Sequence, residues 1–374
     1  MAHTSYQQPK TLSRFRVGEK SKKRFRKKRI NILGAGISGL VAGITLARHG
    51  FCVRIFEKRP RVGSFIEKDI HTLRNYSYNY DVIKKYRSLG IKISHFYPIY
   101  KEIRFFPSSE KLEIYSKKKP LFYNIIRGYK DKRSLDIQLF EEAKKLGVEI
   151  VFGQQRSLED KDIDMVATGA RYRKGIIYGC HYKNVSMEPN TIYFFLGSNR
   201  AFYGYSYINP FEKEASLAIA SPEREKKEYL IKRFSRVKEN KIIKQLLRRA
   251  EVENDFFGFG FFDLPETAIK KGKLYVGEAA GFLDATTGFG VHYAILSGYL
   301  AAKSIIERKN YDELWKKTFG DELKKRYLRR MAFKKIGTKG QNKVAKMLVK
   351  KYGKIIAMRD YIKIYDQISK EVSV

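Results

Sequence analysis

Cysteine and tryptophan are both scarce in this 374-residue chain, which holds two cysteines, Cys52 and Cys180, and one tryptophan. The two cysteines lie far apart and form no C-x-x-C pair, so we expect neither a disulfide framework nor a zinc site, and a reducing compartment fits. The six histidines show no metal-ligand spacing, so no metal is expected. We expect Cys52 to be buried at the start of a strand and Cys180 to lie in a loop.

Long apolar runs are also missing, since no stretch offers 18 uninterrupted apolar residues. The N-terminal region has a basic run at residues 13–29 but no apolar core of a secretory signal. We therefore expect a cytoplasmic protein whose contact with any membrane is peripheral.

Acidic residues are few relative to basic ones, with 39 Asp and Glu against 77 Lys and Arg, which gives a net charge of +38. Such a field favours anionic partners: phospholipid surfaces, nucleic acid or phosphorylated substrates. A lysine-rich solvated surface is the alternative. The densest basic segment, residues 1–28, is expected to be a disordered arm, and no recognised nucleic-acid-binding motif accompanies it.

A glycine-rich turn joins a short apolar strand, Ile30–Leu33, to a helical pattern that ends at Gly50. The turn has the G-x-G-x-x-G spacing, with Gly34 for the tight turn, Gly36 for close approach of a pyrophosphate and Gly39 for helix–strand packing. The free N–H groups at the helix start would face the phosphates. The dinucleotide-site residues expected here are Gly34, Gly36, Ile37, Ser38, Gly39, Glu57 and Lys58.

Glu57 ends the second strand, about 20 residues after the turn, where a carboxylate can accept hydrogen bonds from ribose hydroxyls. The alternative is a tight structural turn without a ligand. Because strand, turn, helix and acid all occur in order, the pattern favours a dinucleotide.

A second glycine-rich junction follows the predicted strand Lys273–Val276 and opens a helix from about Gly290 to Glu307. A ligand held at both ends, such as FAD, would use both junctions, with the second helix N-terminus stabilising negative charge on reduced flavin. Glu278 would hold a ribityl hydroxyl. A third strand ends at Thr168 and Gly169, where the glycine would also let the backbone come close to a ligand.

Between these junctions we expect a hairpin with arms Ile99–Phe106 and Lys111–Tyr115, a helix Leu135–Leu146 and a strand Val148–Phe152. The aromatic-rich segment 178–262 is expected to form a substrate-covering sheet with one helix, Lys226–Ala250. Residues 310–374 have a basic helical pattern. These helices would either pack on the domain or lie on an anionic membrane surface.

Together, the G-x-G-x-x-G turn, the "ATG" at 167–169 and "VGEAAGFLDATTGFG" at 276–290 resemble the geranylgeranyl reductase family, FAD-dependent flavoproteins with the p-hydroxybenzoate hydroxylase-type fold. The resemblance runs from about Arg29 to Ile306. It implies an α/β fold: a discontinuous Rossmann-like FAD-binding domain, an inserted antiparallel β-sheet substrate domain and a helical C-terminal tail. The expected domain segments are 29–90, 125–177 and 263–309 for FAD, 91–124 and 178–262 for the substrate, and 310–374 for the tail.

The resemblance also assigns roles to residues. The late motif is matched by Gly277, Gly281, Asp284, Gly288 and Gly290, whereas Glu278 replaces the usual Asp and Ala285 the usual Pro. Arg127 corresponds to an arginine near the flavin, with Arg133 as the alternative. The stretch 205–210 is similar to a cavity motif Y-x-W-x-F-P, with Tyr207 in place of Trp and Asn209 in place of Phe. The implied substrate pocket contains Tyr205, Tyr207 and Pro210.

The implied function is reduction of isoprenoid C=C bonds, in which reduced flavin supplies hydride and a proton comes from water, Tyr205 or His292. The implied partners are an apolar prenyl lipid, an anionic membrane surface and an electron donor of unknown identity. Two alternatives remain: a flavin monooxygenase or halogenase on the same fold, and a degenerate flavoprotein that mainly binds nucleic acid or a membrane surface.

Overall fold

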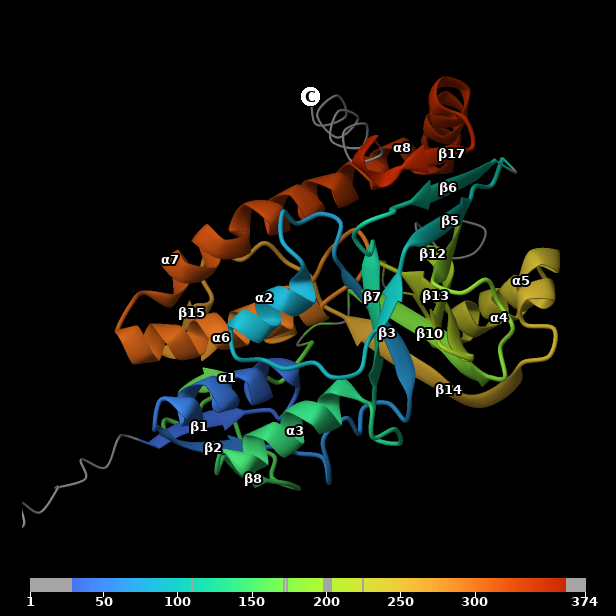
Figure 1. Cartoon of the computed structure of the whole chain (residues 1–374). Helices are drawn as coiled ribbons and strands as arrows, with labels where there is room; N and C mark the ends of the chain where they lie inside the picture. Colours follow the sequence, from blue (N-terminus) through green and yellow to red (C-terminus); the bar gives the residue numbers. More distant parts are fainter. Residues whose placement is uncertain are drawn as a thin grey trace, which may run out of the picture.

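The chain folds around three β-sheets and a set of covering helices, as seen in a computed structural model (Figure 1). The structure describes residues 29–360, apart from 109, 171, 173, 198–203 and 224. The expected basic arm and residues 361–374 of the expected tail lie outside the described residues.

A six-stranded sheet contains the first glycine-rich turn. Its strand order is β15-β16-β9-β1-β2-β8, and all neighbours pair in parallel except β15 and β16. The strands are β1 (Arg29–Leu33), β2 (Cys52–Phe56), β8 (Glu149–Val151), β9 (Met165–Val166), β15 (Ile269–Lys270) and β16 (Lys273–Tyr275). The late strands β15 and β16 therefore complete a sheet that the N-terminal strands begin, as expected for a discontinuous Rossmann-like domain.

Three helices pack around this sheet: α1 (Ile37–Arg48), α3 (Leu135–Lys145) and α6 (Val291–Glu307). Helix α1 contacts both α3 and α6. Ten of the twelve α1 residues are buried, because this helix lies between the sheet and α6. The buried side chains of β1, α1 and α6 belong to one hydrophobic core, which fixes both glycine-rich junctions in place.

The second, eight-stranded sheet has the order β14-β10-β13-β12-β11-β5-β6-β17. Its strands are β5 (Lys101–Phe105), β6 (Lys111–Tyr115), β10 (Gly175–Lys183), β11 (Thr191–Leu196), β12 (Tyr205–Phe211), β13 (Glu214–Ser221), β14 (Glu251–Gly260) and β17 (Ile355–Ala357). The expected hairpin is present as β5 and β6. The sheet is mixed rather than purely antiparallel, since β11 pairs with β5, and β17 with β6, in parallel.

A smaller sheet of order β3-β7-β4 packs against the eight-stranded sheet and against helices α3 and α6; its strands are β3 (Asp69–Arg74), β4 (Tyr97–Ile99) and β7 (Phe122–Arg127). Helix α2 (Val82–Ser88) follows β3. The sequence shows no regular pattern after Glu57, because the apolar residues of this stretch recur neither at every second position, as in a strand, nor at every third or fourth, as in a helix. The core of this sheet includes Ile70 and Ile126.

The structure corrects several local expectations. The helix expected over Lys226–Ala250 is two helices, α4 (Lys227–Lys238) and α5 (Lys241–Leu246), because the Asn240 side chain accepts hydrogen bonds from Ile242 and Ile243 N–H and starts a new helix. Cys52 is exposed, and Cys180 lies buried in β10 rather than in a loop.

The C-terminal region is helical, as expected, but it also returns to the second sheet. Helix α7 (Tyr311–Trp315) leads through a π-helical turn (Lys316–Gly320) into α8 (Asp321–Tyr352), which breaks direction at Gly337, where φ is 57°. Strand β17 follows and pairs with β6. None of the described helices combines the length and apolarity needed to cross a bilayer.

Candidate cofactor site

The first glycine-rich turn lies between β1 and α1, against the end of β9. A Cβ on Gly34 would lie 2.4 Å from Ala167 O, and one on Gly39 would lie 2.1 Å from Gly34 O. These two glycines are therefore required by the packing of the protein itself. A Cβ on Gly36 would meet only Ala167 O, at 4.0 Å. Protein packing does not require a glycine at 36, whereas close approach of a ligand such as a pyrophosphate does.

Glu57 lies beside this turn. Its Oε2 accepts a hydrogen bond from Ala35 N–H at 2.8 Å, and its Oε1 accepts one from Arg59 N–H at 2.9 Å. The carboxylate therefore holds the turn and still has lone pairs for ribose hydroxyls. Of the other residues expected here, Ile37 and Ser38 are buried in the first turn of α1, and Lys58 is exposed.

The second glycine-rich junction begins with a 3₁₀ turn, η1 (Gly277–Ala280), directly after β16. Gly277 has φ of 59° and donates its N–H to Ser297 Oγ at 2.8 Å. Gly281, with φ of 89°, ends the turn, and a Cβ there would lie 2.7 Å from Asp263 Cβ. Gly288 also has positive φ and is exposed, with no atom near the position of its missing Cβ.

The two junctions meet at Ser38. A Cβ on Gly277 would lie 2.9 Å from Ser38 Oγ, and one on Gly298, in α6, would lie 2.3 Å from Ser38 O. The glycines thus allow α6 and η1 to approach the first turn of α1. Both sequence-predicted junctions are brought together, as a ligand with two ends would need.

Helices α1 and α6 start in the same way. Their first intrahelical bonds are Leu40 N–H to Gly36 O and Ala294 N–H to Gly290 O, both 2.9 Å. Neither helix has a side-chain cap or an acidic residue in its first turn. The free backbone N–H groups at the start of each helix and the positive N-terminal end of its dipole therefore suit negative groups of a ligand.

Glu278 is half-buried in η1 and faces the start of α6, since a Cβ on Gly290 would lie 3.3 Å from its Oε1. Desolvation raises the pKa of Glu278 to about 7, although Phe261 N–H and the charge of Arg127 favour its ionised form. The side chain can therefore accept or donate a hydrogen bond to a hydroxyl near neutral pH.

Asp284 is buried in an ion pair that the sequence did not reveal. Its Oδ2 lies 2.5 Å from Arg74 Nη1 and 3.7 Å from Arg326 Nε. Burial alone would raise the pKa of Asp284, but the two guanidinium groups lower it to about 2. Arg74 belongs to β3 and Arg326 to α8, so this carboxylate ties the second junction to two distant elements.

The two arginines proposed from the resemblance lie in different surroundings. Arg127 is buried and holds Asp136 through two contacts, Nε to Oδ2 at 2.7 Å and Nη2 to Oδ1 at 2.9 Å, and its charge reaches Glu278. Arg133 instead contacts Asp131, Glu212 and Glu214. Of the two, Arg127 is the one whose charge acts on Glu278, and a role for either arginine toward a cofactor stays a prediction.

Aromatic side chains of the eight-stranded sheet face the second junction. Tyr205 OH donates to Thr287 O, in the loop before α6. The Tyr205 ring lies 5.8 Å from that of Tyr207 and 5.7 Å from that of Phe194. Phe122 continues this cluster, with its ring 6.4 Å from both Phe194 and Phe289. The wall beside the junction is therefore apolar and aromatic.

The remaining predicted residues lie close to these elements. Pro210 is buried in β12, where its carbonyl accepts a hydrogen bond from Asn124 Nδ2. Thr168 is exposed at the end of β9, and Gly169 has φ of 77° with open space at its Cβ position. His292 is buried in α6 with Nδ1 2.6 Å from Tyr86 OH, and burial next to Arg74 and Arg326 lowers its pKa to about 3. It is neutral at physiological pH and is a weaker proton donor than expected.

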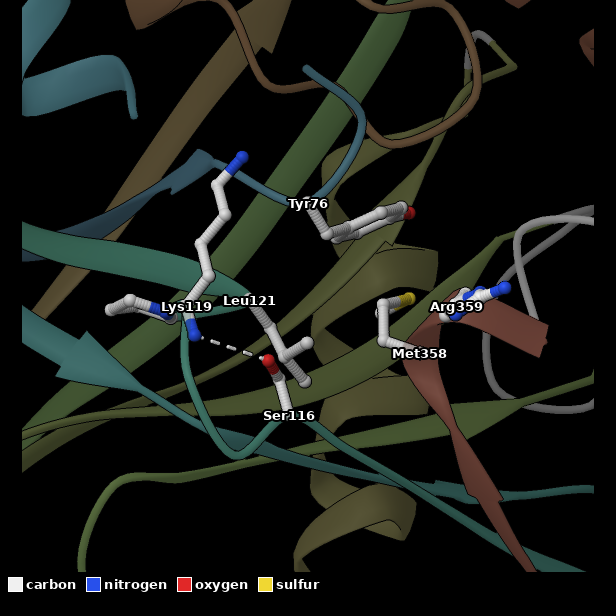
Figure 2. A pocket seen from close by; sticks show the side chains of 7 residues that line it. Tyr76, Ser116, Lys119, Leu121, Met358 and Arg359 are labelled. Atoms are coloured by element: carbon white, nitrogen blue, oxygen red, sulfur yellow. Dashed lines mark hydrogen bonds between the residues drawn. The ribbon is translucent and has the colours of Figure 1, made fainter. Parts of the chain in front are cut away.

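A cavity of about 330 Å³ borders the aromatic cluster (Figure 2). Tyr76, Leu121 and Met358 form its apolar lining, and the Tyr76 ring packs edge-on against Phe122 at 5.4 Å. The Lys119 side chain extends away to donate to the carbonyls of Tyr78 and Tyr80. The cavity is lined by Tyr76, Ser116, Lys119, Pro120, Leu121, Met358 and Arg359.

Known proteins match this architecture. The NAD(P)-binding Rossmann-like domain family matches residues 32–93. An uncharacterized protein of Methanocaldococcus jannaschii is 24% identical over 261 residues, which are 65% of this chain and 64% of that protein. The chain therefore spans somewhat less than two thirds of that curated relative.

Two solved structures illustrate the fold. A geranylgeranyl bacteriochlorophyll reductase-like protein from Thermoplasma acidophilum has a TM-score of 0.72 at 19% identity, covering 92% of this chain and 97% of that one. A flavin-dependent brominase has a TM-score of 0.57 at 16% identity, covering 91% and 100%. These findings confirm the expected architecture. The chain has the fold of the flavin-dependent oxidoreductases, with a Rossmann-type dinucleotide-binding domain.

Proposed function

We propose that the protein is an FAD-dependent reductase of isoprenoid C=C bonds. The observation that carries this proposal is the aromatic wall of Tyr205, Tyr207, Phe194 and Phe122, which lies against the loop before α6. An apolar, unsaturated chain would be bound there by dispersion and shielded from water. The likeness to a geranylgeranyl bacteriochlorophyll reductase-like protein supports the same substrate class.

The residues present suit FAD. The open space at Gly36 would admit the pyrophosphate at the start of α1, with Glu57 beside the ribose. Glu278 would bind a ribityl hydroxyl, and the N-terminus of α6 would stabilise negative charge at the other end of the cofactor. When bound and reduced, FAD supplies the hydride equivalent for such a reduction.

Tyr205 is our candidate for the proton source. The Tyr205 phenol carries a proton at neutral pH, and because desolvation raises its pKa it would release that proton only to a strong base formed beside it. Its hydroxyl already lies at the second junction, on Thr287 O. His292 suits this role less well, because its imidazole is neutral and directed at Tyr86.

The same fold also supports a second candidate function, because a flavin-dependent brominase matches nearly the whole chain. The halogenases of this fold carry a Trp-rich motif, whereas the single tryptophan here, Trp315, is buried against Phe282 and Phe319. This favours the reductase over a halogenase, whereas oxygen-dependent product formation would separate the reductase from a monooxygenase.

The deciding experiment is a single-turnover assay. Dithionite-reduced protein is mixed anaerobically with a prenyl lipid, and the flavin spectrum and the lipid mass are recorded. We expect flavin reoxidation and a gain of two hydrogens per reduced double bond. Reoxidation by oxygen alone, with a hydroxylated or halogenated product, would instead support the second candidate.

A further inference from the structure

The second arm of α8, residues 338–352, carries a stripe of positive charge on its outer side. Lys339, Lys343, Lys346 and Lys350 are all exposed and follow one another at spacings of four, three and four residues. Such spacings place all four on one face of a helix. The segment contains no acidic residue, so nothing within it offsets this charge.

The opposite side of the arm is anchored in the protein. Ala345 and Leu348 are 0% and 3% exposed and belong to the hydrophobic core around β6 and Phe122. Because this inner side is occupied, the arm is held with its lysines facing outward. Figure 1 shows this arm at the outer edge of the molecule, beside β17.

Large apolar side chains are exposed among these lysines. Met347 on the arm is 48% exposed and Ile355 in β17 is 60% exposed, with Tyr352 between them at 36%. Exposed apolar residues within a basic helical face are typical of a segment that lies in a bilayer interface. Nucleic acid would gain little from the aliphatic Met347 and Ile355 side chains, because it binds through phosphates and base stacking.

We propose that this surface, formed by Lys339, Lys343, Lys346, Met347, Lys350 and Ile355, binds anionic phospholipid bilayers reversibly. The lysines would contact lipid phosphates, and Met347 and Ile355 would enter the acyl boundary. This proposal concerns binding and stands whether or not the protein reduces isoprenoids.

The location of this surface gives it a use. Met358 and Arg359, directly after β17, line the 330 Å³ cavity, and Tyr76 on its other side touches Phe122 of the aromatic cluster. The cavity therefore lies between β17 and the aromatic cluster. Binding at this surface would place the cavity at the membrane.

The test is co-sedimentation of the full-length protein with vesicles of phosphatidylcholine alone or with 30% phosphatidylglycerol, over a range of salt concentrations. Each lysine near an anionic surface contributes about five-fold in affinity. We expect the quadruple variant K339E/K343E/K346E/K350E to bind anionic vesicles at least about 100-fold more weakly. The variant M347S/I355S should bind several-fold more weakly with an unchanged salt slope.

The matched control reverses four exposed lysines elsewhere, K226E/K232E/K241E/K244E, so that net charge changes equally. Circular dichroism and thermal melts confirm that each variant folds. If the control variant lost as much affinity for anionic vesicles as the quadruple variant, only net charge would matter, and the proposal would be overturned. Equal wild-type binding to neutral vesicles, or tighter salt-sensitive binding to RNA that the quadruple variant abolishes, would overturn it too.

Discussion

Gly298 in α6 approaches Ser38 in α1 so closely that a Cβ at position 298 would lie 2.3 Å from Ser38 O. Ser38 also lies against Gly277 of the second junction. One serine in the first turn of α1 thus sets the distance between the two ends of the candidate cofactor site.

Gly298→Ala should therefore separate α1 from α6. We expect loss of stability of about 1–3 kcal/mol, as for overpacked cores, together with weaker FAD binding. Thermal melts and the flavin content of purified protein measure both. Gly320→Ala is the control, because Gly320 has helical φ and ψ and a Cβ there makes only ordinary contacts. If Gly298→Ala behaves like this control, the proposed spacing role is wrong.

Gly36→Val should separate cofactor binding from stability. Its added side chain points into open space, so the FAD-free protein should melt within a few degrees of wild type while FAD binding is lost. Gly39→Ala is the contrasting variant, since its Cβ would collide with Gly34 O and should destabilise the fold itself. Spectra and melts of the two variants distinguish these outcomes. A Gly36→Val protein that purifies with full FAD would contradict the assignment.

Glu278 should make stability depend on pH. Its folded pKa of about 7 lies above the ordinary value of 4.5, so the folded state binds the proton more tightly. The associated stability is complete below pH 4.5, falls as the pH rises toward 7 and is absent above it. In FAD-free wild-type protein, the free energy of unfolding should fall by on the order of 2 kcal/mol between pH 5 and 8 because of this group, and Glu278→Gln should remove that fall.

Urea unfolding at pH 5, 6, 7 and 8 checks this prediction. Identical pH profiles for wild type and Glu278→Gln would show that the carboxyl is not perturbed. Glu278→Asp, which restores the residue of the resembled family, tests cofactor contact separately through the FAD dissociation constant.

Tyr205→Phe should slow proton delivery without preventing FAD binding. General acid catalysis contributes roughly 10²–10⁴-fold, so we expect lipid-dependent flavin reoxidation to slow by about 10²-fold or more. Tyr207→Phe, on the same strand, is the control and should change the rate little. A normal rate in Tyr205→Phe would indicate that water supplies the proton.

Asp284→Asn should be strongly destabilising, because it leaves the buried Arg74 and Arg326 without their shared carboxylate. Loss of one partner of a buried pair costs about 3–5 kcal/mol. The exposed pair Lys271–Glu159 provides a control, where Glu159→Gln should change stability little, because solvent screens the charges of an exposed pair. Denaturant unfolding of both variants tests the contrast; equal small losses would refute it.

Local patterns predicted the Rossmann-like part well, because its signals are contiguous. The turn at 34–39, the helix after it and the strand Cys52–Phe56 follow one another in the chain. The glycine spacing marks the turn, and the spacing of apolar residues marks the helix and the strand. The second junction was equally visible from its glycines. The sequence did not reveal Arg74, since nothing local marks an arginine whose partner, Asp284, lies 210 residues later.

Other differences arise from tertiary context. Cys52 begins a strand whose later residues are buried, but its own position lies at the exposed end. The parallel pairing of β11 with β5 and of β17 with β6 depends on long-range contacts that alternation of apolar residues cannot encode. The expected basic arm lies outside the described residues, and the domain boundaries remain predictions.

Strand β17 has a consequence for how the chain folds during synthesis. Ile355, Ile356 and Ala357 pair with β6, whose residues 113–115 leave the ribosome far earlier. Until the last part of the chain emerges, β6 is an open sheet edge with unpaired backbone groups, which can recruit other chains. A truncation within α8 would keep both glycine-rich junctions but leave this edge permanently open. Such a truncated protein should aggregate even though its nucleotide-binding half is complete.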